Sequence, residues 1–158
     1  MRQTHFRGKN KDATVIFIPM KKIIEDEGRR IVRFDRGEEL ISGIASYIEK
    51  EHFGAGSFTA IGATDEVTVS YYNMQKKAYE DTRFEQNLEI VNLTGNISYL
   101  DNTPIVHAHG SFAGPNLKVI GGHIKSLRVS ATCEVAFFPL KGLIKRRRDE
   151  ETGLNLMA

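Results

Sequence analysis

Between residues 57 and 138 the chain is a succession of short strand-like segments separated by turn residues. We predict seven strands there, over residues 57–61, 66–72, 77–84, 87–93, 96–100, 105–112 and 125–138. The separators are Gly62, the Thr94-Gly95 pair, residues 101–104 and residues 114–116. Because parallel strands need long crossover connections, strands joined by such short loops indicate an antiparallel sheet.

We predict one helix before these strands. Asp35 and Glu38 have the spacing of a capping box, with Asp35 at the N-cap, and apolar residues follow at helical spacing at Leu40, Ile41, Ile44, Ala45 and Ile48. We expect the helix to end near Phe53-Gly54, where glycine can take the left-handed conformation. Further strands are predicted over residues 13–20 and 30–34, and a last short one after residue 154.

One helix packed on an antiparallel sheet predicts the α+β class. With 158 residues, of which 41% are apolar, the chain can build a single domain with its own core. We assign residues 1–12 to a flexible N-terminal tail and residues 13–158 to this domain.

Several function classes are excluded by missing motifs. The chain has no Walker-type loop, no Gly-x-Ser-x-Gly elbow and no Cys-x-x-Cys pair. The single cysteine, Cys133, cannot form an intrachain disulfide and is interpreted as a small buried hydrophobe, which suits a reducing cytoplasm. There is no secretory h-region and no apolar run near the ~20 residues that span a bilayer, so we expect a soluble cytoplasmic protein without membrane contact.

Charge gives little support for tight nucleic-acid binding. The formal net charge is only +2, and the charged fraction of 27% is ordinary. One segment, residues 145–151, places four positive charges beside three negative ones. It is either a phosphate-binding patch or a solvated, partly self-neutralised loop.

Three histidines carry the chemistry that can be seen in the sequence. His107 and His109 lie two residues apart in a predicted strand, so they point to one face, while Val106, Ala108 and Phe112 point to the other. Two imidazoles at this spacing can reach one metal ion, but two ordinary half-exposed strand histidines have the same pattern.

His123 favours the metal interpretation. It follows Gly121-Gly122 and begins a strand expected to return beside residues 105–112, and the glycines allow a close approach of the two backbones. Three imidazoles leave a fourth position open for water or a ligand, as in catalytic zinc sites. Nitrogen ligands favour Zn²⁺, although Ni²⁺, Fe²⁺ or Co²⁺ could occupy the same site.

Other candidate residues are weaker. Glu134 is either an outer-shell partner or general base, or a solvent-facing carboxylate on an alternating strand. His5 lies in the predicted tail and His52 at the predicted helix end, so neither is expected to be a ligand.

Four segments together resemble the plants-and-prokaryotes-conserved (PPC) domain family. Along the chain they are residues 88–97 (LEIVNLTGNI), 107–112 (HAHGSF), 121–123 (GGH) and 151–154 (ETGL), which is the order in which that family has them. The resemblance runs over roughly residues 30–156. It implies an α+β fold, assembly into a homotrimer, and a metal held by His107, His109 and His123.

The resemblance also implies an association with DNA, because plant members are nuclear DNA-binding proteins. This chain lacks their AT-hook: it has no Arg-Gly-Arg-Pro core, and only Arg7-Gly8 and Arg36-Gly37 match part of it. Three functions remain open: a trimeric DNA-associated or regulatory module with weak DNA binding, a metal-dependent enzyme, and a small-molecule sensor.

Overall fold

The computed structural model describes residues 20–158. The predicted tail and residues 13–19 of the first predicted strand lie outside this part. Within it the chain forms nine strands and one helix. In chain order they are β1 (Lys21–Asp26), β2 (Arg29–Asp35), α1 (Leu40–Lys50), β3 (Ala55–Asn73), β4 (Ala78–Phe84), β5 (Leu88–Leu100), β6 (Thr103–Ala113), β7 (Val119–Leu140), β8 (Arg146–Arg148) and β9 (Asn155–Met157).

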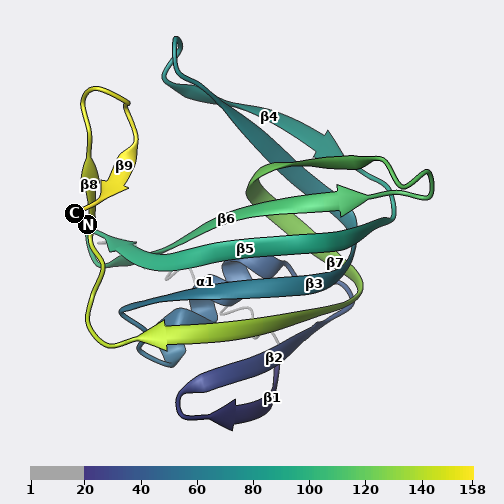
Figure 1. Ribbon diagram of the computed structural model, residues 1–158, viewed down its shortest axis with the longest axis horizontal. Helices are drawn as coiled ribbons and strands as arrows, with labels where there is room; N and C mark the ends of the chain where they lie inside the picture. The colour runs from purple at the N-terminus through teal and green to yellow at the C-terminus, as the bar shows by residue number, and fades with distance from the viewer. Residues whose placement is uncertain (1–19) are drawn as a thin grey trace, which may run out of the picture.

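The strands confirm the predicted antiparallel α+β fold. Seven of them form one sheet in the order β1-β2-β7-β6-β5-β3-β4, and β7 also pairs with β3. The ladders β3–β5, β5–β6, β6–β7 and β7–β3 therefore close into a ring, with α1 packed on it (Figure 1). A separate hairpin, β8–β9, stands at one end of the molecule.

Two predicted strand boundaries are wrong. Residues 57–61 and 66–72 belong to one strand, β3, and residues 88–93 and 96–100 belong to another, β5. Gly62 and Gly95 lie inside these strands for a packing reason. A Cβ at Gly62 would lie 2.2 Å from the carbonyl oxygen of Thr132, and one at Gly95 would lie 2.3 Å from the ring of Phe58. These glycines allow close approach across the sheet and do not form turns.

The helix exists where it was predicted, but its ends differ. Its N-cap is Glu39, whose carboxylate accepts hydrogen bonds from the backbone N–H groups of Ile41 and Ser42. The predicted Asp35 N-cap is wrong: the Glu38 carboxylate accepts from the Asp35 backbone N–H in a turn that precedes the helix. At the other end His52, with φ 56°, takes the left-handed conformation expected of Gly54.

The core lies between α1 and the inner face of the sheet. Leu40, Ile44 and Ile48 on the helix are fully buried, as is Phe137 on β7. Cys133 is fully buried too, and burial raises the pKa of its thiol to about 12, which confirms its interpretation as a small hydrophobe. No helix in residues 20–158 is long and apolar enough to cross a bilayer.

Candidate metal centre

Strand β6 presents two histidines on one face. Ala108, between them, is fully buried, whereas His107 is half-buried and His109 is exposed. This alternation is the one predicted from the His-x-His spacing. Both imidazoles therefore point away from the core, on the outer side of β6.

His123 joins them because of the register of β7. It is the direct cross-strand partner of His109 on one side and of Ser70 on the other. The preceding glycines permit this fit: a Cβ at Gly121 would lie 2.4 Å from the carbonyl oxygen of Gly110, and one at Gly122 would lie 2.9 Å from the Val69 side chain. The close backbone approach predicted at the Gly-Gly pair is present.

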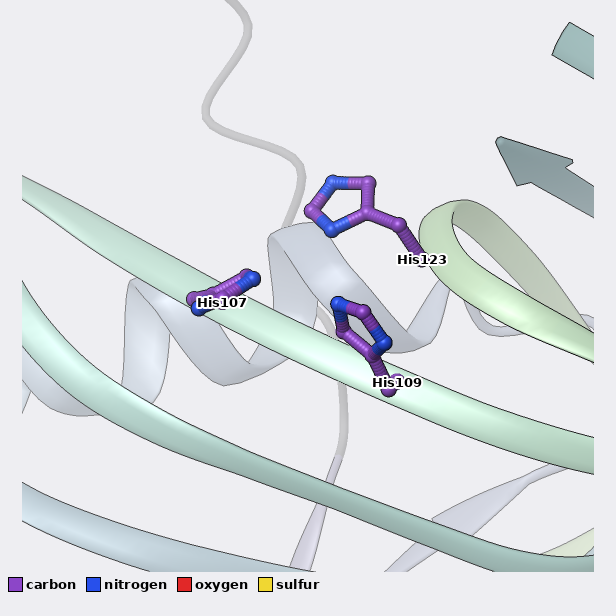
Figure 2. A group of neighbouring side chains, drawn as sticks. All are labelled: His107, His109 and His123. Carbon is purple, nitrogen blue, oxygen red and sulfur yellow. The ribbon is translucent and has the colours of Figure 1, made fainter. Parts of the chain in front are cut away.

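The three imidazoles form a nearly equilateral triangle. Their ring centroids are 5.1 Å apart for His107 and His109, 5.3 Å for His107 and His123, and 5.4 Å for His109 and His123. One nitrogen of each ring faces the space between them (Figure 2), and one ligand atom from each residue lies within 4.8 Å of the others. Neutral imidazoles so arranged have the donor chemistry that a divalent transition metal takes.

The surroundings keep two of the imidazoles in the neutral form. Burial, and next the nearby imidazoles of His107 and His109, lower the pKa of His123 to about 4. The pKa of His107 is also lowered, first by burial and then by the positive charge of Arg146. A neutral imidazole keeps the nitrogen lone pair that a metal requires.

One polar atom at the centre has no protein partner. The Nδ1 atom of His123 is buried and forms no hydrogen bond with any described residue. The ring itself is held in place, since Tyr79 stacks on it with centroids 4.7 Å apart. A buried nitrogen without a partner costs about 1–3 kcal/mol, so its environment fits a group that would coordinate it.

The other sequence candidates lie elsewhere. Glu134 is exposed on the outer face of β7, in a shallow hollow with Ile31, Ile61 and Ala136, and not beside the histidines. His52 follows the helix, and His5 lies outside the described residues. The acidic residues of segment 145–151 form no ion pair with its basic ones within the part of the chain that the structure describes.

Sequence reasoning missed Arg146 and Tyr79, which line a cavity of about 410 Å³ together with His107 and His123. In the sequence Arg146 is one of several consecutive basic residues. Only the tertiary structure distinguishes the half-buried Arg146 from its exposed neighbours.

Comparisons with known proteins identify the family and the fold. The family model of the Plants and Prokaryotes Conserved (PCC) domain matches residues 25–141. None of the curated proteins matches the chain.

Solved structures similar to this chain come from bacteria and archaea. A protein from Bacteroides thetaiotaomicron described as a "putative dna binding protein" is 26% identical, with a TM-score of 0.84 over 88% of this chain and 96% of that one. A "metal-containing protein" from Archaeoglobus fulgidus is 33% identical, with a TM-score of 0.79 over 88% and 97%. A plant- and prokaryote-conserved (PPC) protein from Pyrococcus horikoshii is 28% identical, with a TM-score of 0.78 over 88% and 94%.

Proposed function

Because this chain belongs to the Plants and Prokaryotes Conserved domain family, we propose that it is a metal-binding member that holds one divalent cation with His107, His109 and His123. The observation that carries the proposal is the convergence of three imidazoles around a common space, one of them with a buried, unpartnered Nδ1. The similarity to a 33% identical protein described as metal-containing supports it.

Zn²⁺ is the cation that we propose, since three neutral nitrogen ligands favour it. Three protein ligands leave one coordination position for water or another molecule, unlike structural zinc sites with four protein ligands. A cation held in this way supplies Lewis acidity at that position. The chain's own part is to keep the imidazoles of His107 and His123 neutral and to fix the orientation of the ligands, for example through the stacking of Tyr79 on His123.

We further propose that three copies associate. The outer face of the sheet carries exposed apolar side chains at Ile31, Ile61 and Val91, which are 43%, 57% and 52% exposed. Ile31 and Ile61 line one shallow hollow, and Ile61 and Val91 line the next. An apolar cluster of this kind on an open sheet is typical of a surface that another chain covers.

Weak DNA binding is the second candidate function, and one observation favours it. Lys145, Arg147 and Arg148 are exposed and form no ion pair among residues 20–158, so their charges are free to meet phosphates. The similarity to the Bacteroides thetaiotaomicron protein described as a "putative dna binding protein" also supports this function. With a net charge of +2, such binding is expected to be weak and independent of sequence.

Metal content tests the principal proposal directly. Untagged protein loaded with Zn²⁺ and dialysed at pH 8, where imidazoles are neutral, should retain about one ion per chain by elemental analysis. Retention of no zinc would show that the three residues are ordinary strand histidines.

A further inference from the structure

We infer that the cavity beside the three histidines binds a small organic carboxylate, whose charged group pairs with Arg146 while another of its oxygens faces the metal position. This inference rests on the proposed metal site and names the class of ligand that would use the open position. It is carried by the shape of the cavity, the fixed position of its wall and the unpaired charge of Arg146.

The cavity has the size of a small-molecule site. Its volume of about 410 Å³ falls inside the range of 300–1,000 Å³ usual for ligand pockets. The lining includes His107, His123 and Arg146, with Lys77 and Arg148 as further cations, while Ile105 and Leu154 supply apolar surface. A ligand there would contact a metal position, positive charge and hydrocarbon together.

One wall is the β8–β9 hairpin, which is tied to the tip of the β3–β4 hairpin. The Tyr72 hydroxyl donates to the carbonyl oxygen of Thr152 at 2.7 Å, and the Lys77 ammonium donates to that of Glu150 at 2.8 Å. Gly153 is buried between them with φ 74°, and a Cβ there would lie 3.1 Å from the Tyr72 hydroxyl. The hairpin is therefore held in a defined position over the cavity.

Arg146 is half-buried and held by neutral groups alone. Its Nε donates to the hydroxyl of Ser98 at 2.6 Å, Nη1 to the carbonyl oxygen of Asn155 at 2.8 Å, and Nη2 to the side-chain oxygen of Asn96 at 3.0 Å. No carboxylate lies within ion-pair distance of it in the described part of the chain. The half-buried Arg30, by contrast, is paired with both Glu25 and Glu51.

An uncompensated, half-buried charge is costly, and an anion from outside would relieve that cost. A guanidinium has five N–H donors, and three of those of Arg146 are used by the protein. The two that remain suit the planar, two-oxygen group of a carboxylate.

The charge lies next to the metal position. Asn96, which accepts from Arg146, is the direct cross-strand partner of His107. A ligand of a few carbons that carries a carboxylate and a second oxygen can therefore meet Arg146 and the open metal position together. The apolar lining at Ile105 and Leu154 favours an organic acid over inorganic phosphate.

The test uses full-length, zinc-loaded protein and titrates it with lactate while amide chemical shifts are recorded. Propane-1,2-diol, which replaces the carboxylate by an alcohol, and inorganic phosphate are the comparison ligands. We expect lactate to bind at least about tenfold more tightly than either, with shifts gathered around residues 146–156 and the histidines, because propane-1,2-diol lacks the charged group and phosphate lacks the hydrocarbon.

Arg146→Gln should weaken lactate binding about tenfold or more and leave the zinc content unchanged. Arg147→Gln, an exposed neighbour outside the cavity lining, is the matched control and should bind lactate as wild type does. If Arg146→Gln fails to fold by circular dichroism, Arg146→Lys keeps the charge but loses the two-pronged geometry, and it should still bind several-fold more weakly.

The outcomes separate the two proposals. If zinc stays bound but lactate binds no more tightly than propane-1,2-diol or phosphate, or binds equally to the Arg146 variants, the carboxylate site is wrong and the metal site stands. If wild type loses zinc, the metal site is wrong, and the bridging arrangement of the ligand is wrong with it.

Discussion

His109 and His123 are direct partners across the β6–β7 ladder, although thirteen positions of sequence separate them. This register, set by the approach of Gly121 to Gly110, turns a two-histidine strand pattern into a three-histidine centre. The position of β7 is therefore as important to the site as the histidines themselves.

Replacing His109 should release the metal without unfolding the protein. His109 is exposed, so His109→Ala removes a ligand and leaves the core intact. Zinc affinity should fall by more than the roughly 10–100-fold that loss of an outer-shell partner costs. Zinc stoichiometry and circular dichroism on the same samples check this. His52→Asn is the matched control, because asparagine tolerates the left-handed backbone at that position and the zinc content should not change.

The metal-free protein should lose stability as the pH falls from about 6.5 to about 4. In this window an unfolded chain takes up a proton at His123, near its ordinary pKa of ~6.5, whereas the folded protein keeps the residue neutral because its pKa is lowered to about 4. The unfolded state then binds more protons, so the free energy of unfolding decreases, by on the order of 2 kcal/mol once the shift is discounted for the partial solvent exposure of His123.

Denaturant unfolding of metal-free wild type at pH 7 and pH 4.5 measures this loss. The variant His123→Gln cannot titrate at this position and should lose less stability over the same interval. An equal loss in both proteins would show that His123 is not the source.

The proposed homotrimer predicts a concentration-independent assembly of three chains. Sedimentation equilibrium should give three times the chain mass of 17.8 kDa. Ile61→Lys places a charge in the apolar outer face and should dissociate the assembly, whereas Leu117→Lys, at a loop residue that is 81% exposed, should not. A wild-type monomer at all concentrations would refute the trimer.

DNA binding should be weak and sensitive to salt. Fluorescence anisotropy with a labelled duplex should show loss of binding between about 50 and 200 mM salt and no preference among sequences. The double variant Lys145→Gln/Arg147→Gln should bind more weakly, while Arg29→Gln, whose charge already pairs with Asp26, should behave as wild type. Tight binding to one sequence that survives high salt would contradict this picture.

Gly95→Ala should destabilise the fold by about 1–3 kcal/mol, since the added methyl group would overlap the buried ring of Phe58. It should also weaken zinc binding, because the same methyl group would lie 2.7 Å from the carbonyl oxygen of His107. Thermal unfolding and zinc titration check both effects. Gly114→Ala is the control, as its nearest neighbour lies at 3.4 Å.

The fold class and the histidine pattern were predictable because both depend on local spacing. Alternation along a strand placed His107 and His109 opposite Ala108 without knowledge of the rest of the chain. The strand breaks at Gly62 and Gly95 were not predictable, because a glycine required by a neighbouring strand has the same local signal as a glycine in a turn.

Strand β1 was missed for a different reason, although its partner β2 was predicted over residues 30–34. The residues that join the two strands, Glu27 and Gly28, both have positive φ, which is typical of a tight hairpin turn. However, all six residues of β1 are exposed, so the strand has no apolar alternation to reveal it. Arg146 was missed because its neighbours Asn96 and Ser98 lie about fifty positions earlier in the chain.

The central place of β7 has a consequence for biosynthesis. β7 pairs with β2, β3 and β6 and follows all three in the chain, so the ring of ladders cannot close until the ribosome has delivered β7. Before β7 is added, β3 and β6 have unpaired strand edges, which can pair with the strands of other nascent chains. Contacts this distant in sequence also slow folding. The incomplete chain should therefore depend on chaperones. Mutations that slow the pairing of β7 should lower the yield of native protein more than they lower its stability.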